Sequence, residues 1–167
     1  MTNLRQLPKL PQLKKSGAID EKSYEEILAS LEKNQRILIL SPRNSGKNTI
    51  QNAIVNHLHR LFKETLVIPS VESVPTKKFK SLARLKNLKR MAKEYHSCVA
   101  IVKYLGTGKA DITELTKYLL DSFDLIIDVR NVEGTRMVCN LIRGKKYLRY
   151  TCTHPKFKKY QAAWFFN

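Results

Sequence analysis

The residues best suited to chemistry lie in one short segment, residues 41–49, which reads Ser-Pro-Arg-Asn-Ser-Gly-Lys-Asn-Thr. Its Gly46-Lys47 pair fits the phosphate-binding pattern G-x-x-x-x-G-K-[ST], which follows a strand and opens a helix. In that pattern, backbone N–H groups of the loop and the helix N-terminus bind phosphate oxygens, and the lysine contacts the β and γ phosphates. The segment therefore predicts a phosphate-binding loop. The residues expected to bind the phosphates are Arg43, Asn44, Ser45, Gly46, Lys47, Asn48 and Thr49.

Two positions of this loop depart from the pattern. Ser41 stands where the first glycine belongs, and Asn48 stands where a serine or threonine hydroxyl would bind Mg²⁺. The amide oxygen of Asn48 is a poorer magnesium ligand. Thr49 comes one residue late, which on a helix rotates its side chain by about 100°. We therefore expect phosphate binding to be retained and magnesium-dependent hydrolysis to be weak or absent.

A second candidate is the apolar segment 125–127, which Asp128 follows. An acid at the end of a hydrophobic strand, about 80 residues after the loop lysine, fits the carboxylate that holds magnesium in phosphate-loop enzymes. The alternative is a buried strand followed by an ordinary turn aspartate. Asn48 and Asp128 are thus the predicted magnesium ligands.

The elements that must position these residues alternate between strand and helix. Apolar runs predict strands at residues 36–40, 66–68, 98–104, 125–129 and 147–152. Apolar residues at helical spacing predict helices at residues 21–33, 48–62, 77–93, 111–120 and 134–142, whereas residues 71–76 have no regular pattern. This alternation predicts a three-layer α/β fold with a central, mostly parallel sheet.

Length and composition indicate one globular domain. The chain has 167 residues, 43% of them hydrophobic, and no apolar run approaches the ~20 residues of a membrane span. Pro8 and Pro11 predict an extended arm over residues 1–15, before a domain at 16–154 and a basic, aromatic tail at 155–167. With three scattered cysteines and no signal peptide, we expect a cytoplasmic protein, either free or peripheral at the inner face of the membrane.

The charge is strongly positive, because 31 lysines and arginines stand against 14 acids, a net charge of +17. Basic residues also gather on one face of the helix predicted at residues 77–93. Such a surface fits nucleic acid, an acidic protein or an anionic membrane. The alternative is a solvated lysine-rich surface. The candidate nucleic-acid contacts are Lys77, Lys78, Lys80, Arg84, Lys86, Lys89, Arg90 and Lys93.

Residues 17–154 resemble the hexameric traffic ATPases of type IV and type II secretion, conjugation and type IV pili, which are RecA-like P-loop NTPases. Three boxes carry the resemblance: the phosphate loop, a strand with an acid and an arginine, and a histidine box. In this sequence they are residues 41–49, Phe123-Asp-Leu-Ile-Ile-Asp128-Val-Arg130-Asn-Val-Glu133, and Gly144 with Thr151-Cys152-Thr153-His154.

The resemblance implies that Arg130 and His154 sense the nucleotide, and that other subunits of a secretion, pilus or conjugation machine are the partners. The family's acidic box is absent, which leaves Glu72 as the nearest acid that could activate water. The catalytic candidates are therefore Asp128, Glu72 and His154. The chain resembles a shortened, degenerate relative that binds ATP or ADP, with Mg²⁺ as the implied metal, hydrolyses the nucleotide weakly or not at all, and acts as an interaction or regulatory subunit.

Two other functions remain open. In one, the loop is a relic that binds no cofactor, and the basic surface binds nucleic acid or an acidic protein. In the other, the chain is a small active ATPase in which Asn48 and Glu72 replace the missing groups. Nucleotide binding that is lost in Lys47→Ala would exclude the relic.

Overall fold

The computed structural model describes residues 8–41, 47–61, 63–68, 71–73, 83–95, 97–104, 115–132, 135–143 and 148–151. Its elements are α1 (Leu10–Lys15), α2 (Glu21–Glu32), β1 (Arg36–Ser41), α3 (Lys47–Arg60), β2 (Leu66–Val67), β3 (Val71–Ser73), α4 (Ala83–Glu94), β4 (Cys98–Tyr104), β5 (Leu125–Val132), β6 (Thr135–Arg143) and β7 (Leu148–Thr151). A short helical stretch at residues 115–119 lies between β4 and β5. Within this part of the chain, no helix is long and apolar enough to cross a membrane.

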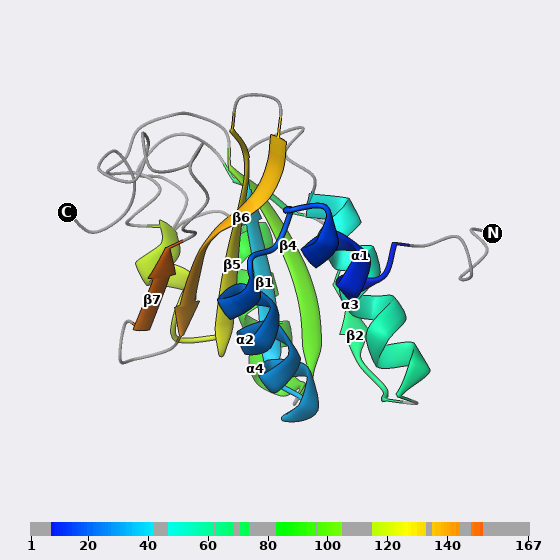
Figure 1. Ribbon diagram of the computed structural model, residues 1–167. Coiled ribbons are helices and arrows are strands. Elements are labelled where there is room, and N and C mark those ends of the chain that lie inside the picture. The colour runs from blue at the N-terminus through cyan, green and yellow to red at the C-terminus, as the bar shows by residue number, and fades with distance from the viewer. Residues whose placement is uncertain are drawn as a thin grey trace.

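The described strands form one seven-stranded sheet in the order β2-β4-β1-β5-β6-β7, with β3 also paired to β4 (Figure 1). β2 and β3 pair with the beginning and the end of β4, so the two short strands share one edge of the sheet. The strands from this edge to β5 run parallel, whereas β6 runs in the opposite direction and pairs antiparallel with both β5 and β7. The sheet is therefore mostly parallel, as the sequence predicts.

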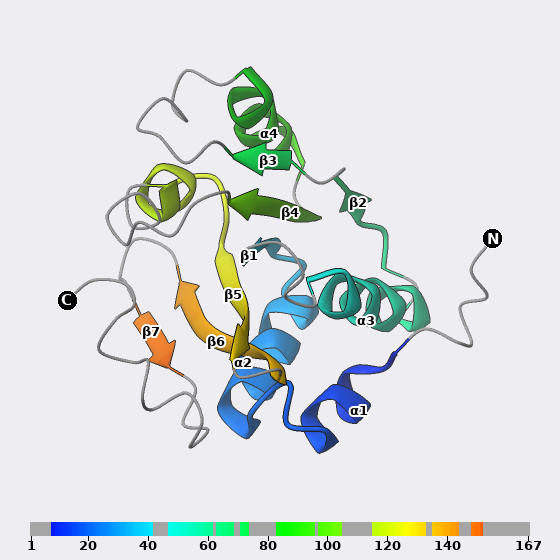
Figure 2. The same cartoon turned by 90° about the horizontal axis from the view of Figure 1, so that it is seen from above.

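Helices cover both faces of the sheet (Figure 2). Alternate residues of β1 belong to different cores: Ile37 and Ile39 pack with α1, α2 and α3, whereas Leu38 and Leu40 pack with α4 and residues 115–123. We call these the α3 face and the α4 face of the sheet. The two cores confirm the predicted three-layer α/β architecture, with β1 buried on both faces.

The predicted extended arm over residues 1–15 is wrong for its second half, which forms α1. Pro11 lies in the first turn of this helix, where its missing N–H group has no intrahelical partner to lose. Leu10 and Leu13 face the core and retain 1% and 9% of their exposure. The prolines therefore start a helix rather than keep the segment extended.

Two further predictions are corrected by pairing across the sheet. The helix predicted at residues 134–142 is wrong, because Thr135–Arg143 forms strand β6, which pairs with β5 along its length. Val71–Ser73, within a segment without regular pattern, forms β3 because it pairs with the end of β4. In both cases a strand already in the sheet supplies hydrogen bonds that outweigh weak local preferences.

The remaining elements follow the sequence closely. Asp20 caps α2, since its carboxylate accepts a hydrogen bond of 2.8 Å from the backbone N–H of Ser23. β7 lies inside the segment predicted for it. α3 begins one residue before its predicted segment, and α4 ends one residue after its own. Residues 77–82 and 111–114, the beginnings of two predicted helices, lie outside the described residues, as does the tail at 155–167.

Candidate functional site

The candidate site lies where the parallel strands end. β1 ends at Ser41, which is fully buried, and α3 begins at Lys47, the lysine of the motif. A strand before the motif and a helix that begins at its lysine are the two elements that flank a phosphate-binding loop. The residues between them, including Arg43, Asn44, Ser45 and Gly46, lie outside the described residues.

The strand register brings other predicted residues to the carboxyl end of the parallel strands. Ser41 lies beside Lys103 of β4, and Lys103 lies beside Glu72 of β3. On the other side of β1, Leu40 lies beside Asp128 of β5. Because neighbouring strands are about 4.8 Å apart, the Glu72 backbone is about 10 Å from that of Ser41. The sheet therefore gathers the predicted acids around the end of β1, with Glu72 two strands away.

Asp128 is inside a strand rather than at its end, because β5 continues to Val132. The Nε atom of Arg130 lies 3.0 and 2.9 Å from its two carboxylate oxygens. Both side chains are buried, at 0% and 3% exposure. Residues 125, 127 and 129 face α3, so alternation places Asp128 and Arg130 on the α4 face. The predicted magnesium ligand and the predicted nucleotide sensor therefore form an ion pair with each other.

This arrangement does not fit a magnesium site. Mg²⁺ requires oxygen ligands at about 2.0–2.1 Å in near-octahedral geometry. A metal bound by Asp128 would lie next to the buried positive charge of Arg130, which already contacts both carboxylate oxygens. The other predicted ligand, Asn48, is exposed in the first turn of α3. Among the residues described, no group of three or more His, Cys, Asp or Glu side chains could hold a metal ion.

The basic residues predicted on the outer face of α4 differ in exposure and in their contacts. Arg84 and Lys86 are exposed on α4. Lys89 is instead largely buried: its Nζ lies 3.0 Å from Asp121 Oδ1 and 3.8 Å from the centre of the Tyr118 ring. Lys89 therefore fastens α4 to the segment before β5, and the prediction that it belongs to the outer contact surface is wrong.

The other basic candidates differ in their contacts. Lys93 is exposed and lies 3.7 Å from the same aspartate, Asp121. Arg90 is exposed and paired with Glu94. Lys77, Lys78, Lys80, Glu133 and His154 lie outside the described residues.

Lys103 is the residue of this edge that the sequence analysis missed. It follows the buried residues 98–102 in the way that Ser41 follows 37–40. Lys103 carries the same signal as Asp128, a polar residue directly after an apolar run.

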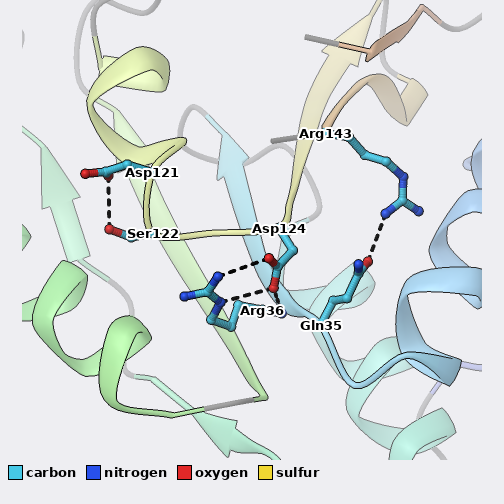
Figure 3. Close-up of polar contacts among 6 residues, drawn as sticks. All are labelled: Gln35, Arg36, Asp121, Ser122, Asp124 and Arg143. Carbon is cyan, nitrogen blue, oxygen red and sulfur yellow. Dashed lines mark hydrogen bonds and ion pairs between the residues drawn. The ribbon is translucent and has the colours of Figure 1, made fainter. Parts of the chain in front are cut away.

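The opposite end of the sheet carries a polar network that fixes the register of β1 and β5 (Figure 3). Arg36 donates to Asp124 from its backbone N–H at 2.8 Å and from its guanidinium at 3.1 and 3.0 Å. Asp124 returns a backbone hydrogen bond of 2.9 Å to the Arg36 carbonyl. Arg143 joins the end of β6 to Gln35 at 2.8 Å. Locking β1 to β5 here keeps Leu40 beside Asp128 at the far end.

No protein-family model and no curated protein matches the chain. Among solved structures, it is similar to the crystal structure of the VirB11 ATPase from the Brucella suis type IV secretion system in complex with sulphate, with a TM-score of 0.48 and 15% identity. The similarity covers 86% of this chain and 56% of that chain, so this chain spans little more than half of that protein's length. The fold described above rests on the chain's own sheet order and its two helical layers.

Proposed function

We propose that the chain is a phosphate-loop domain that binds ATP or ADP and hydrolyses it weakly or not at all. The observation that carries this proposal is the passage from buried β1 to a helix that begins at Lys47, directly after Gly46. A helix start of this kind presents backbone N–H groups and a partial positive charge to an anion.

Three features support weak hydrolysis. The carboxylate of Asp128 is held by Arg130, and Asn48 stands where the pattern has a hydroxyl. Glu72, the acid left to activate water, lies two strands away from β1. Binding depends mainly on the loop and the helix N-terminus, whereas hydrolysis also needs these groups, so the first function is better supported than the second.

The resemblance of the three sequence boxes extends the proposal to a setting. The domain would serve as an interaction or regulatory subunit of a secretion, pilus or conjugation machine. Co-purification of the tagged chain with subunits of such a machine from its own cells tests this part. Recovery that is equal for the tagged chain and an unrelated basic protein would contradict it.

Calorimetric titration of ATP and ADP tests the nucleotide proposal. We expect the wild type to bind, and Lys47→Ala to bind at least tenfold more weakly, because the lysine makes a charged contact with phosphate. Lys22→Ala, which removes an exposed lysine of α2, is the matched control and should bind like the wild type. A wild type that binds neither nucleotide would contradict the proposal.

The second candidate function, binding of a polyanion such as nucleic acid, is favoured by the exposure of Arg84 and Lys86. α4 turns Leu85, Leu88 and Ala92 toward the core, which leaves Arg84 and Lys86 exposed on the two flanks of the helix. Phosphate contacts require exposed positive charges of this kind and no base-specific groups.

A further inference from the structure

Lys103 occupies a distinctive place at the candidate site. It lies beside Ser41, the last residue of β1, and follows Val102 at the end of a buried parallel strand. Val99 and Ile101 belong to the core of the α3 face, so alternation places Lys103 on that same face. It is half-buried there, whereas most lysines of a protein are solvated.

α3 begins above this part of the sheet. Ile50, in the first turn of α3, packs in the same core as Ile39 and Ile101. These two residues precede Ser41 and Lys103 by two positions on their strands and share a face with them. A helix that follows a parallel strand starts at the carboxyl end of that strand. Lys103 therefore lies at the end of the sheet where β1 leads into the predicted phosphate loop.

The charged residues at this end of the sheet differ from those of a magnesium-dependent site. A triphosphate carries several negative charges, which Mg²⁺ and a lysine normally share. Here the carboxylate expected to hold the metal lies on the α4 face and is paired with Arg130. Lys103 adds a positive charge on the α3 face, one strand from the loop. Protein cations can thus take over the charge that the metal would supply.

We propose that the site binds nucleoside polyphosphates without a metal ion, and that Lys103 contacts the phosphates together with Lys47. This inference rests on the proposed function, because it requires a nucleotide at the loop. It names the form of the ligand: metal-free ATP or ADP rather than the magnesium complex. Removing Mg²⁺ should then leave the affinity nearly unchanged.

Titrations of ATP in buffer with Mg²⁺ and in metal-free buffer with EDTA test this inference. We expect the wild-type Kd to change less than threefold when the metal is removed. Lys103→Met keeps the apolar stem but removes the charge, and should weaken metal-free binding at least tenfold. Lys103→Arg, which retains the charge, should stay close to the wild type. Lys22→Met is the control for an equal loss of net charge elsewhere. Thermal unfolding establishes that each variant is folded.

Glu72 provides a test of how Lys103 acts, since the two residues are neighbours in the register of β3 and β4. If Lys103 contacts phosphate, Glu72→Gln should bind ATP as tightly as the wild type or more tightly. The double variant Lys103→Met/Glu72→Gln should still bind more weakly than the wild type. Wild-type affinity in the double variant would mean that Lys103 only balances Glu72, and would overturn the inference.

The remaining outcomes separate this inference from the proposed function. A wild type that binds no nucleotide under any condition contradicts both. Binding that is seen with Mg²⁺ and lost with EDTA supports the proposed function and overturns metal independence. Metal-free binding that is equal in Lys103→Met and in the wild type, or weakened equally by Lys22→Met, overturns the role of Lys103.

Discussion

The guanidinium Nε of Arg130 lies within 3.0 Å of both carboxylate oxygens of Asp128, two residues before it on β5. Neither side chain retains more than 3% of its exposure. Two residues that the family resemblance assigns to magnesium and to nucleotide sensing are thus bound to each other inside the protein. This pair is the main structural reason to expect impaired hydrolysis.

Breaking the pair from one side should destabilise the fold strongly. Arg130→Gln leaves the Asp128 carboxylate buried without its cation, and we expect a loss of about 3–5 kcal/mol in the free energy of unfolding. Asp128→Asn/Arg130→Gln should lose clearly less than the sum of the two single variants, because neither charge is then left alone. Urea unfolding of the wild type and three variants measures this. Additive losses would show that the pair is not coupled.

The stability should depend on pH through Asp124. Burial raises the pKa of the Asp124 carboxyl, but the hydrogen bonds and charge of Arg36 outweigh it, so the pKa lies below its usual value. A lowered folded-state pKa stabilises the protein above the unfolded-state pKa of about 3.9, and this contribution disappears as the pH falls through the folded-state pKa.

Asp124→Asn removes this contribution. We expect it to cost about 1–2 kcal/mol at pH 7, from charged hydrogen bonds to a partly exposed pair. The difference from the wild type should shrink below pH 4. Denaturant unfolding between pH 3 and pH 7 measures it, and a difference that stays constant over this range would argue against the Asp124 ion pair as its source.

α1 should contribute to the core although the sequence predicts an extended arm. Leu10 retains 1% of its exposure, so Leu10→Ala should lower the free energy of unfolding by about 2–4 kcal/mol. Lys15→Ala, an exposed change in the same helix, should stay within about 0.5 kcal/mol of the wild type. Equal stability of Leu10→Ala and the wild type would mean that α1 does not pack as described.

The two kinds of basic residue on α4 should separate in experiments. Lys89→Met should lower the melting temperature, because it removes the contacts with Asp121 and Tyr118. Arg84→Gln/Lys86→Gln should leave the melting temperature nearly unchanged. If α4 binds nucleic acid, the double variant should weaken binding and reduce the salt slope by up to about two, one for each lost phosphate contact.

Fluorescence anisotropy with labelled DNA and RNA measures this binding. Lys22→Gln/Lys33→Gln, which removes the same charge from exposed positions of α2 and its C-terminus, is the control. An affinity that both double variants reduce equally would reflect net charge alone and would remove α4 as the binding surface.

Elements whose signals lie within a short segment can be predicted from the sequence alone. The apolar run at 37–40 and the helical spacing after Lys47 predict β1 and α3, and the structure confirms both. Asp20 caps α2 by contacting Ser23, a residue only three positions away. Such signals lie within a few residues of one another, so a single sequence contains all that is needed to recognise them.

Contacts between distant residues depend on how the sheet assembles. β6 is a strand because β5 lies beside it, although its own pattern suggests a helix. Arg36 and Asp124 are 88 residues apart, and their contact aligns Leu40 with Asp128. The same packing pairs Asp128 with Arg130 and places Lys103 beside Ser41. The pairing energy between distant segments depends on the assembled sheet. No local sequence pattern therefore shows which charged residues come together at the site.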